Sequence, residues 1–112
     1  VKGGKLFAVA QTRPQRSKAY PNVPTVAESG FPGFDATTWY GLIAPAKVDA
    51  GYVKRLNEDV NKILLIPEVV ERLAASGAED SGGTPERFAE FMRNERSKYA
   101  KLVKDAAIKI DS

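Results

Sequence analysis

The scarcity of strand-forming sequence is the feature that most limits what this chain can fold into. Only two stretches have the short apolar character of a strand, residues 5–12 ("KLFAVAQT") and 36–44 ("ATTWYGLIA"). Most of the second half has helical spacing instead. Two or three strands beneath four helices would leave strand edges and sheet faces uncovered. The sequence therefore predicts a segment of a larger α/β protein, or a chain that takes its missing strands from a partner.

A loop and a very short helix are expected between the two strands. Residues 13–24 ("RPQRSKAYPNVP") contain three prolines and cannot form regular structure. Thr25 is followed three residues later by Glu28, which is the spacing of a capping box, and Gly30 stands where a C-cap belongs. This pattern predicts a short helix that begins after Thr25.

Capping residues and apolar periodicity predict the remaining elements. They are a helix over about 50–65 capped by Asp49, a helix from Pro67 to a stop at Gly77, a brief third strand over 78–80, and a last helix from Thr84 and Pro85 to about 107. One face of the last helix is apolar, through Phe88, Phe91, Met92, Tyr99, Leu102, Val103 and Ala106. The expected order is β-α-β-α-α-(β)-α.

The composition argues against most enzyme classes. The chain has no cysteine and no histidine, so disulfides, thiolate metal sites and the usual general base of a nucleophilic triad are excluded. An enzyme without histidine, acting through Tyr and Lys or through carboxylates, stays open as a rival. The adjacent carboxylates Glu58 and Asp59 point apart on a helix, however, and no catalytic constellation converges for it. We therefore predict no catalytic residue, no metal and no cofactor. Residues 82–84 ("GGT") precede a helix start and leave a weak alternative, an anion site.

The positive charge lies near the N-terminus and leaves a second alternative open. The net charge is +3, and residues 1–35 hold five basic residues against two acidic ones. Arg13, Arg16 and Lys18 would carry the contacts of a small nucleic-acid-binding module. Such footprints are usually denser and fixed on one helix face, so a solvated basic loop is the favoured interpretation. No run of about 18 apolar residues is present to span a membrane.

Trp39 is the only tryptophan of the chain and stands next to Tyr40. In a strand these neighbours point to opposite faces, so one is expected to enter a core and the other to face a cleft or a helix. For a lone tryptophan the core is the favoured position.

The order of these motifs resembles a known family. The most specific part is the block "VPTVAESG", "FPGF" and "WYGLIAP", preceded by "VKGGKLFAVAQT" and followed by "RLNEDVNKIL", "PEVVERLAASGAED" and "GGTPERFAEFMRNE". Together these segments look like the C-terminal third of the Bug receptors, the periplasmic solute-binding proteins of tripartite tricarboxylate transporters. The resemblance covers essentially residues 1–112. Arg87 stands where an acidic residue is expected, which alters the start of the last helix only slightly.

The resemblance implies a fold and a function. Bug receptors are two-lobed α/β proteins of the periplasmic-binding-protein type (type II), and this chain would be a fragment of one lobe: its hinge strand, its closing strand and its helices. They close on small organic carboxylates, pass them to membrane subunits and catalyse no reaction. Thr38, Trp39 and Tyr40 would then line the cleft wall, while the main clasp of the ligand lies in sequence outside this chain.

The same resemblance yields two expectations for the chain by itself. Half a cleft offers few fixed hydrogen-bond donors, so useful carboxylate affinity is not expected. The strands over 5–12 and 36–44 would have open edges, which recruit another chain. A homodimer formed by strand pairing or segment exchange is therefore expected, with no nucleic acid partner.

Overall fold

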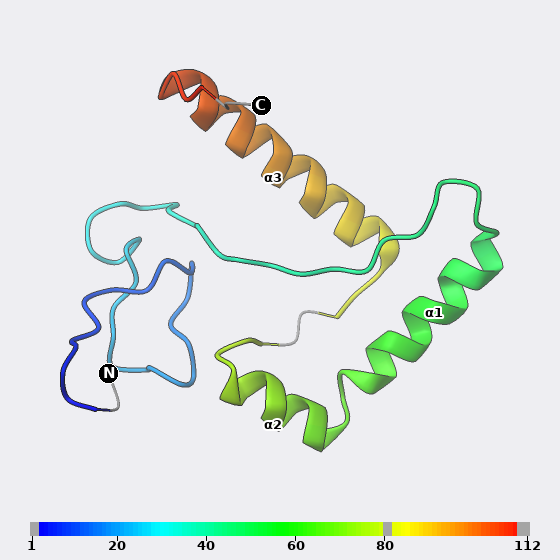
Figure 1. The fold of residues 1–112 in the computed structure, drawn as a ribbon, viewed down its shortest axis with the longest axis horizontal. Helices are drawn as coiled ribbons and strands as arrows, with labels where there is room; N and C mark the ends of the chain where they lie inside the picture. Colours follow the sequence, from blue (N-terminus) through cyan, green and yellow to red (C-terminus); the bar gives the residue numbers. More distant parts are fainter. Residues whose placement is uncertain (1–2, 80–81, 110–112) are drawn as a thin grey trace. The chain divides into compact units, whose positions relative to one another are not determined.

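The computed structural model describes residues 3–79 and 82–109, and the chain divides into two compact units, Val1–Ile43 and Ala44–Ser112 (Figure 1). Within its described residues, the first unit holds neither a helix nor a strand. The second unit holds α1 (Ala50–Ile63), α2 (Pro67–Ala75) and α3 (Pro85–Asp105). The α/β order predicted from the sequence is thus present only in its helical part.

The strands predicted over 5–12 and 36–44 do not form. One isolated parallel bridge joins Gln11 to Thr25, and the amide of Ala36 donates to the carbonyl of Thr12 at 2.9 Å. A strand satisfies its backbone N–H and C=O groups on a neighbouring strand. Within the described residues neither stretch has such a neighbour, so both run as irregular extended chain. The third strand, predicted over 78–80, does not form at residues 78 and 79, and residue 80 lies outside the described residues.

The capping box at Thr25 is confirmed, but the helix behind it is only a turn. The amide of Thr25 donates to Glu28 Oε2 at 2.7 Å, and the amide of Glu28 donates to Thr25 Oγ1 at 3.1 Å. Gly30 then takes a φ of +110°, which helical backbone cannot continue. A single turn fixes several dihedral angles for few hydrogen bonds, so the segment is too short to propagate as a helix.

The three longer helices are confirmed, with ends close to those predicted. Asp49 Oδ1 accepts from the amide of Gly51 at 2.7 Å before α1, and Thr84 Oγ1 accepts from the amide of Arg87 at 3.2 Å before α3. Gly77 has a φ of +78° just after α2, the conformation expected of a glycine stop. Side-chain caps satisfy amides that have no partner inside the helix, which is why these boundaries are readable from sequence.

The described residues contain no buried apolar side chain. The side chains that are buried are polar: Thr25, Ser17 and Glu95. Phe7 is 92% exposed and Leu42 78%, in the two stretches that were predicted as strands. An amphipathic helix or strand gains stability only when its apolar face is covered. This chain therefore presents the apolar faces of a core without the elements that would close it.

Candidate functional site

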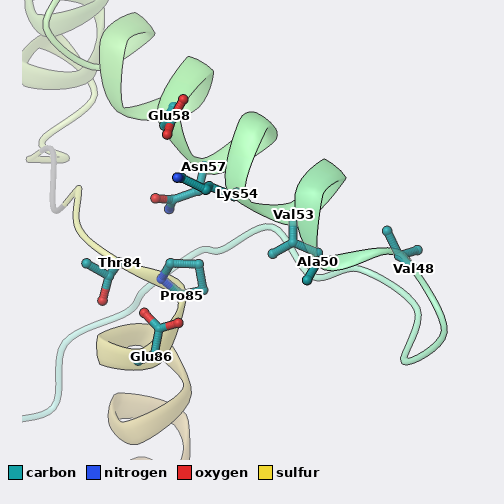
Figure 2. A pocket seen from close by; sticks show the side chains of 9 residues that line it. All are labelled: Val48, Ala50, Val53, Lys54, Asn57, Glu58, Thr84, Pro85 and Glu86. Atoms are coloured by element: carbon teal, nitrogen blue, oxygen red, sulfur yellow. The ribbon is translucent and has the colours of Figure 1, made fainter.

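An open groove lies in the second unit, where the first turns of α1 approach the start of α3 (Figure 2). Its volume is about 510 Å³. The lining side chains come from both helices and the residues that precede them: Val48, Ala50, Val53, Lys54, Asn57, Glu58, Thr84, Pro85 and Glu86. The lining holds two carboxylates, Glu58 and Glu86, and a single ammonium, that of Lys54, so its charge disfavours an anionic ligand.

Two asparagines of α1, of which Asn57 lines the groove, bind the backbone just before α3. Asn57 Nδ2 donates to the carbonyl of Gly83 at 2.8 Å, and Asn61 Nδ2 donates to the same carbonyl at 2.9 Å. Asn61 Oδ1 in turn accepts from the amide of Gly83 at 2.8 Å. The side chain of Asn61 thus pairs with both backbone groups of one glycine. We call this arrangement of Asn57, Asn61 and Gly83 the asparagine clamp.

The clamp explains the glycine pair that precedes α3. A Cβ on Gly82 would overlap Asn61 Oδ1, so only glycine fits this approach. The amide of Gly83, which an anion site would need, already donates to Asn61. The anion-site interpretation of residues 82–84 is therefore wrong at Gly83, and Gly82 serves the close approach to Asn61 instead.

Among the described residues, no group of three or more acidic, histidine or cysteine side chains is placed to hold a metal ion. No helix in residues 3–79 and 82–109 is both long and apolar enough to cross a bilayer.

The first unit is organised by the side chain of Gln11. Its Nε2 donates to the carbonyls of Tyr20 at 2.8 Å and Val23 at 2.7 Å, and its Oε1 accepts from the amide of Ser17 at 2.9 Å. These bonds fold the proline-rich loop back onto residue 11. The sequence analysis missed this role, because a glutamine in an apolar run gives no local sign of which loop it will reach.

Arg16 belongs to the same loop and pairs with Glu28. Its Nε lies 2.9 Å from Glu28 Oε2, and its guanidinium also donates to the carbonyl of Pro21 at 3.0 Å. The Arg16 hydrogen bond, followed by that of the Thr25 amide, holds the pKa of Glu28 below its ordinary value of 4.5. Arg16 is thus engaged within the chain, which weakens its candidacy as a phosphate contact.

The residues predicted to line a cleft all lie in the first unit. Trp39 is 39% exposed and Tyr40 91%, and Thr38 is exposed as well. They follow a turn in which Asp35 Oδ1 accepts from Thr37 Oγ1 at 2.6 Å. Trp39 is not a buried core residue of this chain, and its role in a cleft stays a prediction.

Glu95 is the other residue whose position the sequence did not reveal. It lies on α3 and is only 9% exposed, although the sequence analysis placed only apolar side chains on the covered face of that helix. Its carboxylate forms an ion pair with Lys98, one turn further along. A buried carboxylate is tolerated when it is paired in this way.

Comparison with known proteins identifies the family. The sequence profile described as the tripartite tricarboxylate transporter family receptor matches residues 1–108. The chain belongs to this family. The resemblance to the Bug receptors is thereby confirmed, and the family is one of solute-binding receptors rather than enzymes.

Individual relatives show the same match and its extent. A protein in the tcbD-tcbE intergenic region of Pseudomonas sp. is 39% identical over 100 residues, covering 88% of this chain and 30% of that protein. Protein BugT of Bordetella pertussis is 34% identical over 110 residues, covering 98% of this chain and 34% of BugT. A protein in the clcB-clcD intergenic region of Pseudomonas knackmussii is 33% identical over 104 residues, covering 92% and 62%. The chain thus spans about a third of the length of the first two relatives.

Proposed function

We propose that this chain is the C-terminal segment of a periplasmic receptor that captures small organic carboxylates and delivers them to the membrane subunits of a tripartite tricarboxylate transporter. The family match over residues 1–108 carries this proposal. The proposed receptor performs no chemistry and requires no cofactor or metal. The nucleic-acid alternative has no observation in its favour, since Arg16 is engaged by Glu28.

The exposed apolar side chains support a segment of a larger fold. Phe7 and Val9 in residues 5–12, and Leu42 and Ile43 near residue 44, are between 78% and 92% exposed. At about 25 cal/mol for each Å² of apolar surface removed from water, covering such side chains is strongly favourable. In the intact receptor we expect residues 5–12 to form the hinge strand and 36–44 the closing strand of one lobe.

Thr38, Trp39 and Tyr40 are the proposed contribution of this segment to the cleft wall. They lie together on the stretch expected to become the closing strand, at the proposed boundary between the lobes. The groove in the second unit is a poor candidate for the ligand, because it sets two carboxylates against one ammonium. The main clasp of the ligand is expected in the remaining sequence of the receptor.

Calorimetry on the intact receptor tests the function. Titration with succinate, glutamate and citrate should give binding with at least one of them, whereas a neutral analogue of the same size should not bind. Failure of every carboxylate in the panel, with binding of single-stranded nucleic acid at about 50 mM salt, would reverse the choice between the two candidate functions.

Trp39 offers a direct test of the proposed cleft wall. Its emission should shift when a carboxylate binds the intact receptor, because closure changes the polarity around a ring at the lobe boundary. A Trp39→Phe variant identifies the part of the signal that belongs to this residue. An emission spectrum that stays unchanged under saturating ligand would remove Trp39 from the proposed site.

The chain by itself should behave differently from the intact receptor. We expect calorimetry to show no carboxylate binding tighter than about 1 mM, since half a cleft must still meet the cost of ordering the ligand. Light scattering should show a dimer or larger assembly formed through the apolar stretches 5–12 and 36–44. A clean monomer would contradict the expectation of strand or segment exchange.

A further inference from the structure

The C-terminal part of α3 carries an excess of positive charge that the helix does not neutralise. Between residues 93 and 109 the sequence has six basic residues and two acidic ones. Both acids are paired within the helix, Glu95 with Lys98 and Asp105 with Lys101. Of the four that remain, Lys109 lies beyond the end of α3 at Asp105. We call the other three, Arg93, Arg96 and Lys104, the basic stripe.

Arg93 and Lys104 lie on the side of α3 away from its apolar residues, and Arg96 lies at the edge of that side, next to Met92 and Val103. The members of the stripe are separated by three and eight residues, which places them along one side of a helix. All three are exposed, and the structure gives none of them an ion pair among the described residues. The other side of the helix carries partly covered apolar side chains, Phe88, Met92 and Val103. When that side is covered in the intact receptor, the stripe still faces outward.

We propose that the basic stripe docks an acidic protein surface, and, resting on the function proposed above, that this surface belongs to the outward-facing part of the transporter's membrane subunits. Exposed ion pairs are individually weak, because water and salt screen them. Three of them raise the rate of encounter and fix an orientation, and they do not hold a long-lived complex. A receptor that must arrive, release its ligand and leave needs contacts of this weak, salt-sensitive kind.

The neighbours of the stripe favour a protein partner over a lipid surface. A helix that lies on a membrane places apolar side chains beside its cations, so that they enter the acyl boundary. Ser97 and Ala100, which are small, lie between the members of the stripe, and the acidic Glu90 precedes Arg93 by one turn. The apolar neighbours of Arg96, Met92 and Val103, are partly covered. Three cations by themselves attract anionic lipid too weakly to anchor a receptor.

Charge reversal in the intact receptor tests the proposal. The stripe variant carries Arg93→Glu, Arg96→Glu and Lys104→Glu. The matched control carries Lys18→Glu, Lys47→Glu and Lys62→Glu, three exposed residues outside α3 whose reversal changes the net charge equally. A second stripe variant with glutamine at the three positions removes charge without adding acids. Each is titrated against nanodiscs that contain the membrane subunits, at about 50 and about 300 mM salt.

The expected result is a loss of affinity of about tenfold or more for the stripe variant at low salt, against a change of about twofold for the control. The glutamine variant should fall between them, and the wild-type affinity should fall as salt rises. Equal losses in the stripe variant and the control would overturn the proposal, and so would binding of wild type to anionic nanodiscs without subunits. Calorimetric carboxylate binding, measured separately, should be unchanged in all variants. If wild type binds no carboxylate, that result counts against the proposed function and not against docking by the basic stripe.

Discussion

Different kinds of hydrogen bond stabilise each of the two units of this chain. The second unit consists of helices whose backbone hydrogen bonds are satisfied within each helix, with Asp49 and Thr84 closing two helix starts. Among its described residues, the first unit has no regular element, and its shape depends on side chains that bond to backbone: Gln11, Arg16, Thr25 and Glu28. The comparison shows that helices survive outside their full context, whereas stretches that need a neighbouring strand do not.

Both units nevertheless share the same deficit. Apolar side chains in each of them stay exposed, such as Phe7 in the first unit and Leu65, at 75%, in the second. Polar contacts therefore contribute more to the stability of this chain than apolar packing does. In the intact receptor we expect apolar packing to contribute more than polar contacts in the helical unit, because covering α3 would bury its aromatic side chains.

The largest effect is expected from Phe91→Ala in the intact receptor. Phe91 is 37% exposed here, and its ring stacks on that of Phe88 with centroids 6.4 Å apart. Once covered, truncation of a buried aromatic side chain should lower the free energy of unfolding by about 3–5 kcal/mol. Denaturant unfolding measures this, with Arg93→Ala on the outward side as a control that should change little. A loss under about 1 kcal/mol would show that α3 is peripheral to the core.

Asn61→Ala should have the next largest effect, because it dismantles the asparagine clamp. The amide of Gly83 would lose its partner, Asn61 Oδ1, while its carbonyl would keep Asn57. Leaving a partly buried amide unpaired costs about 1–3 kcal/mol in the free energy of unfolding. Asn94→Ala, an exposed asparagine of α3, is the matched control for the same measurement. Equal stabilities of the two variants would mean that the clamp contributes nothing.

Gln11→Ala tests the corresponding polar anchor of the first unit. Two carbonyls and one amide would lose their bonds to this side chain, but solvent reaches part of the site, so we expect a cost of only about 1 kcal/mol. Amide NMR shifts should change in the loop over 13–24 and stay constant in α1. Gln15→Ala, an exposed glutamine of the same loop, should leave these shifts in place. Changes that reach α1 equally would contradict the separate organisation of the two units.

The smallest effect concerns the pH dependence of the Arg16–Glu28 pair. Because the folded pKa of Glu28 is lowered, the pair stabilises the loop above the ordinary value of 4.5 and loses this contribution as the pH falls through the folded pKa. NMR titration of the Glu28 carboxyl should give a midpoint below 4.5 in wild type. Arg16→Ala should raise that midpoint, whereas Lys18→Ala should leave it unchanged. If the Glu28 midpoint is the same in wild type and in Arg16→Ala, the lowered pKa is due to the hydrogen bond from the Thr25 amide instead.

The sequence by itself determined the local structure of this protein and its family. The N-caps Asp49 and Thr84, the start of α2 at Pro67 and the capping box at Thr25 depend on residues within a few positions of one another. They can therefore be predicted without the rest of the fold. The motif order, which includes the block around Trp39, was specific enough to indicate the receptor family, and the match over residues 1–108 agrees with it.

Only the tertiary structure decided which distant groups meet. Asn61 reaches Gly83 across 22 positions, and Gln11 reaches Val23 across 12, and neither spacing has a periodic signature. The same reason explains why the strands over 5–12 and 36–44 were predicted and do not form. An apolar stretch indicates a tendency to form a strand, but a strand also needs hydrogen bonds to a neighbouring strand. Among the described residues, neither stretch has a neighbouring strand.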